Sequence, residues 1–123
     1  MKKIYTNQAP EPVGPYSQAV IVNGFLYCSG QIGIDPKTNT MIDGSIEEQT
    51  LQIMKNVSSV LKEAGYSFDD VVKTTCFLDD MSNFSAFNEI YAQYFVSKPA
   101  RSCVEAKLPK NAKVEVEVIA YKA

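Results

Sequence analysis

The final part of the chain alternates strictly between two kinds of side chain. In residues 113–121, every second residue from Val114 to Ala120 is small or β-branched and apolar, and the residues between them begin with Glu115 and Glu117. Successive side chains of a β-strand point to opposite faces, so this pattern predicts a strand with one apolar face and one mixed face. The apolar face of such a strand must pack against another layer of the fold.

Five further segments are rich in β-branched or aromatic residues and are predicted to be strands. They are residues 4–6, 19–22, 25–28, 71–78 and 101–107. The dipeptide Asn23-Gly24 separates the second segment from the third. Because both residues tolerate positive φ, this dipeptide predicts a tight hairpin.

Two helices are predicted between these strands. Ser45 and Glu48 have the three-residue spacing of a capping box, and apolar residues then recur at helical spacing until Gly65, so the first helix should run over residues 46–64. The second helix should carry an aromatic stripe and stop before Pro99. We expect this stripe to pack in the core and not to hold a cofactor; it consists of Phe84, Phe87, Tyr91, Tyr94 and Phe95.

Together these elements predict a single α+β domain over residues 1–123, with about six strands in one mixed sheet and two helices on one face. We place Arg101 and Glu105 with Glu115 and Glu117 on the face away from the helices. Nothing left in the chain could cover that face. The pattern therefore favours a homo-oligomer with ionic groups at its subunit junctions.

Two absences in the composition restrict the chemistry. The chain contains no histidine, which removes the usual general base at neutral pH, the usual zinc ligand and the histidine-activated nucleophiles. It also contains a single arginine, Arg101, against eleven lysines. A guanidinium differs from an ammonium chiefly in its planar, bidentate recognition of carboxylates and phosphates. Arg101 is therefore the first candidate for a ligand-binding residue.

Charge and cysteine content indicate the class of partner and the compartment. A net charge of −2 provides no basic surface for nucleic acid, and no apolar stretch is long enough to span a membrane. The three cysteines, an odd number in apolar segments, are typical of reduced thiols, so we expect a cytoplasmic protein.

Five motifs resemble those of one family. In order they are Gly14-Pro15-Tyr16-Ser17-Gln18-Ala19, Cys28-Ser29-Gly30-Gln31-Ile32, Glu47-Glu48-Gln49-Thr50, Pro99-Ala100-Arg101-Ser102-Cys103-Val104-Glu105 and Glu115-Val116-Glu117. This set resembles the RidA family of reactive intermediate/imine deaminases, formerly called YjgF. The match extends from about Thr6 to Ala120.

The resemblance implies a fold similar to that of Bacillus-type chorismate mutase, assembled as a homotrimer with active sites between neighbouring subunits. It also implies hydrolysis of 2-iminopropanoate and 2-iminobutanoate, which pyridoxal-phosphate enzymes release, to 2-keto acids and ammonia. No metal or organic cofactor is implied. By motif match the catalytic residues are Arg101, which would hold the substrate carboxylate, Glu115, which would act on the hydrolytic water, and Tyr16. The other pocket residues implied are Ser29, Gly30, Asn88 and Cys103.

Each of these residues also has a structural interpretation. Arg101 could form an ion pair with Glu105 or Glu117 at a subunit interface, and Glu115 could lie on the solvated side of its strand. Tyr16 could be a buried structural residue, Ser29-Gly30 an ordinary turn, and Asn88 a brace or cap of its helix. Cys103 shares a strand face with Arg101, but nothing nearby in the sequence would make it a nucleophile.

Two other functions remain open at this point. One is a non-catalytic trimer that binds small carboxylates or acts as a chaperone-like factor. The other is an endoribonuclease, which the single arginine, the missing histidine and the acidic composition disfavour.

Overall fold

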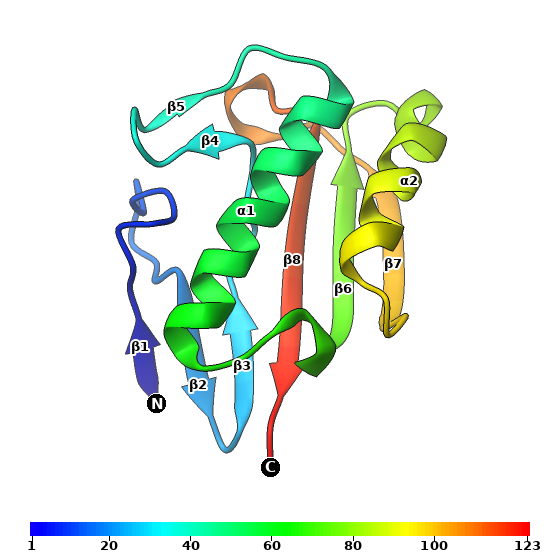
Figure 1. Cartoon of the computed structure of the whole chain (residues 1–123). Helices are drawn as coiled ribbons and strands as arrows, with labels where there is room; N and C mark the ends of the chain where they lie inside the picture. The colour runs from blue at the N-terminus through cyan, green and yellow to red at the C-terminus, as the bar shows by residue number, and fades with distance from the viewer.

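In the computed structural model, which describes residues 1–123, six strands form one mixed sheet in the order β1-β2-β3-β8-β6-β7 (Figure 1). Helices α1 and α2 cover one face of this sheet, as the sequence predicts. All neighbouring strands are antiparallel except β6 and β7, which are parallel. The strands are β1 (Lys2–Ile4), β2 (Ala19–Val22), β3 (Phe25–Cys28), β6 (Val71–Leu78), β7 (Ala100–Glu105) and β8 (Val114–Tyr121).

Shorter elements lie in the connections. A two-stranded ribbon, β4 (Ile34–Asp35) with β5 (Thr40–Met41), occupies the segment before α1, where the sequence predicts only a loop. Three single-turn 3₁₀ helices follow: η1 (Phe68–Asp70), η2 (Met81–Asn83) and η3 (Pro109–Asn111). The predicted hairpin is confirmed, because Asn23 and Gly24 connect β2 to β3 with φ values of 51° and 82°.

Helix α1 spans Ile46–Ala64, the predicted range. Both hydrogen bonds of the capping box are present: the backbone N–H of Glu48 donates to Ser45 Oγ at 3.2 Å, and that of Ser45 donates to Glu48 Oε1 at 3.1 Å. Gly65 ends the helix with a left-handed φ of 84°. The helix presents an apolar stripe that includes Ile53 and Val57 to the sheet, where both are buried.

Helix α2 spans Phe84–Tyr94, and its aromatic stripe packs in the core as predicted. Phe87 is fully buried, and the rings of Tyr91 and Phe95 stack at 4.4 Å between centroids. The buried hydroxyl of Tyr91 is 2.7 Å from Thr74 Oγ1 on β6. This hydrogen bond fixes the position of α2 over the edge of the sheet.

The two faces of β8 differ as the alternation predicts. Its four small or β-branched residues from Val114 to Ala120 are at most 1% exposed and lie beneath the helices. The opposite face, called the open face below, has no covering layer within the chain. Several large apolar side chains on this face are 38–47% exposed, namely Val22, Phe25, Tyr27, Val104 and Tyr121.

The first strand begins and ends earlier than the predicted residues 4–6. Strand β1 ends at Ile4, which pairs with Ala19. Thr6 cannot continue the ladder, because its backbone N–H and C=O groups are hydrogen-bonded to the Gln18 side chain. Thr6 N donates to Gln18 Oε1 at 2.7 Å, and Gln18 Nε2 donates to Thr6 O at 3.0 Å. A side-chain amide thus replaces the neighbouring strand at this position.

The prediction that Arg101 and Glu105 share a face with Glu115 is wrong. Alternation establishes that Arg101 and Glu105 lie on one side of β7, but the register against β6 decides which side. Arg101 pairs with Thr74, and Glu105 pairs with Leu78. Both partners on β6 are fully buried beneath the helices, so Arg101 and Glu105 lie on the helix face of the sheet.

Neither helix of the structure is long and apolar enough to cross a membrane.

Candidate active site

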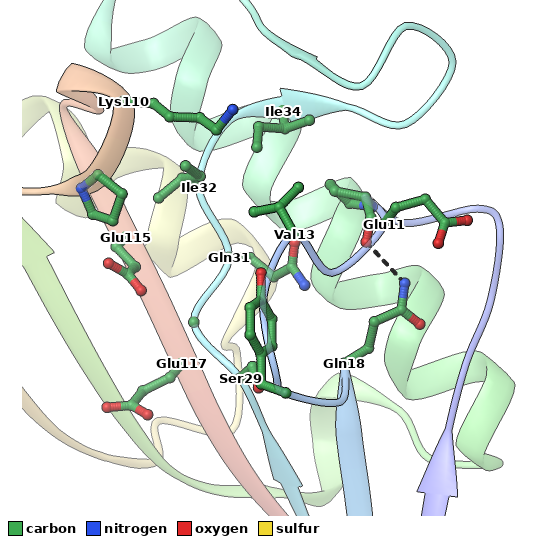
Figure 2. A pocket seen from close by; sticks show the side chains of 14 residues that line it. Glu11, Val13, Gln18, Ser29, Gln31, Ile32, Ile34, Lys110, Glu115 and Glu117 are labelled. Atoms are coloured by element: carbon green, nitrogen blue, oxygen red, sulfur yellow. Dashed lines mark hydrogen bonds between the residues drawn. The ribbon is translucent and has the colours of Figure 1, made fainter.

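A cavity of about 500 Å³ opens beside the N-terminal end of β8, near Glu115. It collects segments that are far apart in the chain: the loop between β1 and β2, the segment after β3, η3 and the start of β8 (Figure 2). Four of the predicted site residues line it: Tyr16, Ser29, Gly30 and Glu115. We call this space the glutamate cavity.

The carboxylate of Glu115 lies directly against the backbone of Gly30. A Cβ atom at residue 30 would be 2.8 Å from Glu115 Cδ and would collide with Oε2. The two segments are held together by paired backbone hydrogen bonds, from Gln31 N to Val116 O at 2.9 Å and from Val116 N to Gln31 O at 3.1 Å. Only glycine therefore leaves room for the Glu115 carboxylate in this arrangement.

Burial raises the pKa of Glu115, and the neighbouring charge of Glu117 raises it further. The two glutamates project from the same side of β8 in Figure 2, as alternate residues of a strand must. A carboxyl group with a raised pKa is a better proton acceptor than an ordinary glutamate once it is ionised. Glu115 is thus suited to exchange protons with a water molecule in the cavity.

Tyr16 is 51% exposed in the chain, so it is not a buried structural residue of the single subunit. It follows Gly14-Pro15, and its backbone N–H donates to Gly14 O at 2.9 Å. Its ring lines the glutamate cavity. The phenol is therefore available to a ligand or to a second chain.

Ser29 has a role that the sequence did not indicate. Its hydroxyl donates to Ser17 O at 2.6 Å, and its backbone N–H donates to Gln18 O at 2.9 Å. The side chain thus joins the end of β3 to the loop that carries Tyr16. Ser29 lines the cavity, but its side chain chiefly stabilises the cavity wall through this hydrogen bond.

Arg101 occupies a second site, on the helix face at the edge of the sheet. One of its terminal nitrogens donates to Asn88 Oδ1 at 2.7 Å. The guanidinium carbon lies 4.7 Å from the centroid of the Tyr91 ring and 5.5 Å from that of Phe84. Stacking on aromatic rings restricts the plane of the guanidinium and leaves its other N–H groups free.

No carboxylate of the chain accepts a hydrogen bond from Arg101. Glu105, one of the two proposed partners, instead accepts a hydrogen bond from Met81 N at 2.9 Å. Arg101 and Asn88 border a cavity of about 450 Å³ to which Lys98 also contributes. This space, called the arginine cavity below, contains two cationic residues and no acidic residue, so it suits an anionic group.

The three cysteines differ in exposure. Burial raises the pKa of Cys28 and Cys76 to about 12, and both thiols are inert at neutral pH. Cys103 is half-buried beside Arg101. Burial raises its pKa, while the Arg101 charge acts in the opposite direction. Cys103 can therefore line a pocket near Arg101 but is not an activated nucleophile.

The structure brings Tyr16, Ser29, Gly30 and Glu115 together, and separately Arg101 with Asn88. The glutamate cavity and the arginine cavity share no lining residue and lie on opposite faces of the sheet. No single ligand of a few atoms can contact both groups within one chain. No three cysteine or acidic side chains converge into a possible metal site.

Sequence reasoning did not find several residues of the glutamate cavity, among them Glu11, Val13 and Lys110. Glu11 and Val13 belong to the irregular loop between β1 and β2, and Lys110 belongs to the single-turn η3, so no periodicity relates these residues to one another. Lys110 has a left-handed φ of 55°, which is uncommon for a lysine. Chain connectivity places η3 directly before β8, but no signal in the sequence could have placed the loop between β1 and β2 at this end of the strand.

The chain is thus a small α+β protein with both helices on one face of a mixed sheet and with two chemically different cavities on opposite faces of that sheet. The family model described as Endoribonuclease L-PSP matches residues 6–122. The chain therefore belongs to this family, which includes the RidA and YjgF proteins, and the resemblance found in its motifs is confirmed.

Named relatives support this membership. A RutC family protein of Pyrococcus horikoshii is 51% identical over 121 residues, which cover 97% of this chain and 96% of the relative. The crystal structure of RidA from an Antarctic Psychrobacter species is 40% identical, with a TM-score of 0.95, and the match covers 99% of this chain and 100% of that one. TdcF of E. coli, solved with bound serine, is 36% identical with a TM-score of 0.94 over the whole of both chains.

Proposed function

We propose that this chain hydrolyses 2-imino acids to 2-keto acids and ammonia, as a homotrimer whose active sites lie between subunits. One observation carries the proposal: an arginine without an ion-pair partner, suited to a carboxylate, and a half-buried glutamate, suited to a water molecule, lie on opposite faces of the sheet. An imino acid has a carboxylate directly beside an electrophilic C=N carbon, so it needs both groups at once. A second copy of the chain would bring the arginine cavity of one subunit to the glutamate cavity of the next.

Substrate binding would depend on Arg101. Its free N–H groups would bind the carboxylate of the imino acid through charge-assisted hydrogen bonds, each contributing roughly 1.5–3 kcal/mol. Asn88, Tyr91 and Phe84 would hold the guanidinium in position before the substrate arrives. The C=N group would then lie toward the glutamate cavity of the neighbouring subunit.

The hydrolysis requires one water molecule and a proton shuttle. Glu115 would take a proton from the water while its oxygen forms a bond to the imine carbon, and the nitrogen would receive that proton. In the second step Glu115 would take the proton of the new hydroxyl and transfer it to the amino nitrogen, so that the C=O bond forms, the C–N bond breaks with its electron pair on the nitrogen, and ammonia leaves. Tyr16 would donate a hydrogen bond to the reacting group. A positioned acid–base residue of this kind accelerates a reaction typically about 10²–10⁴-fold.

Support for the oligomer comes from the open face. Its exposed aromatic and branched side chains, which include Phe25, Tyr27 and Tyr121, form a surface that a monomer seldom leaves in water. The resemblance to trimeric family members supplies the number of subunits. In a closed ring, one surface of each chain would contact a different surface of the next chain, and this contact would repeat at every junction. Each chain would therefore contribute Arg101 to one site and Glu115 to another.

A second candidate is a trimer that binds small amino or keto acids without turnover. The observation in its favour is the relative TdcF, whose structure contains bound serine. An endoribonuclease, which the family description names, is a weaker candidate because the chain has no histidine and only one arginine for RNA contacts. Incubation of the purified protein with RNA, with and without Arg101→Ala, tests that activity directly.

The deciding experiment measures the rate of 2-keto acid release from 2-iminobutanoate generated in the assay, with semicarbazide trapping the free imine. We expect the wild type to accelerate release, and Arg101→Ala and Glu115→Gln to fall to the uncatalysed rate while keeping the same oligomeric state. Glu63→Gln, on the exposed side of α1, is the matched control and should retain full activity. A wild-type rate equal to that of buffer would exclude this hydrolysis and favour the binding protein.

A further inference from the structure

Gln18 lies where the loop between β1 and β2 ends, and only 2% of its surface is exposed. Its amide makes three hydrogen bonds, all to the backbone of that loop. Gln18 Oε1 accepts from Thr6 N at 2.7 Å, and Gln18 Nε2 donates to Thr6 O at 3.0 Å and to Pro10 O at 2.9 Å. The last of these is the dashed line in Figure 2. The acceptor and both donors of the amide are therefore occupied.

The loop held by Gln18 forms one wall of the glutamate cavity. It contains no helix or strand between Ile4 and Ala19. Its far end is tied down by the hydrogen bond from Ser29 Oγ to Ser17 O. Two further side-chain hydrogen bonds of the loop lie at the exposed surface: Tyr5 OH donates to Glu11 within the loop, and Glu11 N donates to Asn39 Oδ1 outside it. Gln18 is thus the buried anchor of a loop that carries Tyr16.

We infer that Gln18 is a positioning residue for the proposed hydrolysis, because its three hydrogen bonds hold the loop so that Tyr16 faces Gly30 and Glu115. This inference rests on the proposed function. Without the amide, Thr6 N, Thr6 O and Pro10 O would be buried without partners, and the loop would move to restore hydrogen bonds with water. Gln18 would act through Tyr16 and would not itself contact the reacting atoms.

The first arm of the test does not depend on activity. Gln18→Met keeps the length of the side chain but removes all three hydrogen bonds, and the exposed Gln93→Met on α2 is its matched control. We expect hydrogen exchange of the amides in residues 7–17 to rise by about tenfold or more in Gln18→Met, with α1 unchanged. The control should exchange like the wild type. Unchanged exchange in residues 7–17 would overturn the inference.

The second arm is a double-mutant cycle on kcat for 2-iminobutanoate. Gln18→Met should lower kcat by about 10- to 100-fold in the wild-type background, the range expected when a reacting group is misplaced. In the Tyr16→Phe background it should lower kcat by less than about threefold, because the group that it positions is already missing. In the Arg101→Lys background the full factor should remain.

The outcomes separate the two hypotheses. The same loss of kcat in all three backgrounds would show that Gln18 acts as a general stabilising residue, and the inference would be wrong. If Gln18→Met does not fold, Gln18→Glu replaces it, because a carboxylate keeps the acceptor for Thr6 N but lacks both donors. A wild type without activity contradicts the proposed function, whereas the exchange arm still decides whether Gln18 holds the loop.

Discussion

Arg101 and Glu115 lie on opposite faces of one sheet, separated by strand β6. The β6 residue opposite Arg101 is Thr74, which is fully buried beneath α2, whereas the residue opposite Glu115 is Phe77, on the open face. A hydrogen-bonded sheet therefore separates the two groups most suited to an imino acid. This relationship makes any joint action of Arg101 and Glu115 a property of two chains.

Mixing of two inactive variants tests this arrangement. Arg101→Ala and Glu115→Gln should each be inactive alone, because each lacks one half of every site. After unfolding and joint refolding at equal amounts, random assembly should restore about one quarter of the wild-type activity, since a quarter of junctions pair an intact Arg101 with an intact Glu115. The rate of 2-keto acid release measures this recovery. A mixture as inactive as its components would place both groups in one subunit.

Gly30→Ala should abolish activity with little loss of stability, because the new Cβ would displace the Glu115 carboxylate from its position. Gly65→Ala is the contrasting control. It places alanine at a left-handed φ of 84° with no atom within 4 Å, so it should destabilise the fold by about 1 kcal/mol and leave activity unchanged. Thermal unfolding and turnover of each variant provide the comparison. Full activity of Gly30→Ala would show that the contact is dispensable.

The pH dependence of kcat/KM should report the ionisation of Glu115. Burial first, and Glu117 second, raise the pKa of this group, so activity should appear above the ordinary glutamate range as pH rises. Glu117→Gln removes the second cause and should move this limb to lower pH. A limb that stays in place in Glu117→Gln would assign the titration to another group.

The pH dependence of the free energy of unfolding should also reflect the raised pKa of Glu115. A carboxyl group whose pKa is raised by folding binds more protons in the native state than in the unfolded state, so its ionisation lowers stability as pH rises through the native pKa. Glu115→Gln should therefore unfold at a higher temperature than the wild type at pH 7. The difference should disappear below the ordinary pKa of glutamate. Equal unfolding temperatures at pH 7 would contradict the burial of this charge.

Asn88→Asp should weaken substrate binding more than it slows the chemical step. The new carboxylate would accept a charge-assisted hydrogen bond from Arg101 at the position of the present 2.7 Å contact and would compete with the substrate carboxylate. We expect KM to rise by about tenfold, the effect of losing one such interaction. Asn23→Asp, in the distant hairpin, is the control. A fall in kcat at constant KM would argue against the carboxylate clamp.

Asn56→Leu should destabilise the fold by about 1–3 kcal/mol, because it leaves buried carbonyl groups without a donor. The fully buried Asn56 amide donates to Ile34 O at 2.9 Å and to Ile32 O at 3.3 Å, and so joins α1 to the segment after β3. Urea unfolding at fixed chain concentration measures the change. The exposed Ser58→Ala on the same helix should change stability by less than about 0.5 kcal/mol.

The sequence predicted those parts of the fold whose signals are local. The capping box of helix α1 and the glycine that ends it lie directly at the two ends of the helix, so the sequence predicts its range correctly. The side of the sheet on which Arg101 lies depends on the pairing of β7 with β6, which is a tertiary relationship, and it was predicted wrongly. The predicted range of strand β1 is wrong for a similar reason, because the backbone of Thr6 is hydrogen-bonded to the side chain of Gln18, twelve residues away.

The residues of the candidate site were likewise predictable only where the signal is local. Motifs identified residues that the structure does collect in the glutamate cavity, such as Tyr16 and Gly30. They did not reveal that Gly30 is required by contact with Glu115, nor that Ser29 uses its hydroxyl on Ser17. These facts depend on distances between segments that meet only after folding.

The unequal exposure of the three thiols makes the chain suitable for single-site labelling without mutagenesis. Cys28 and Cys76 are buried, so a fluorinated thiol reagent at alkaline pH should modify Cys103 alone. The resulting ¹⁹F signal would originate beside Arg101, on the face of the sheet opposite to Glu115 of the same chain. It would give a spectroscopic record of ligand arrival at one half of the site while the other half remains chemically untouched.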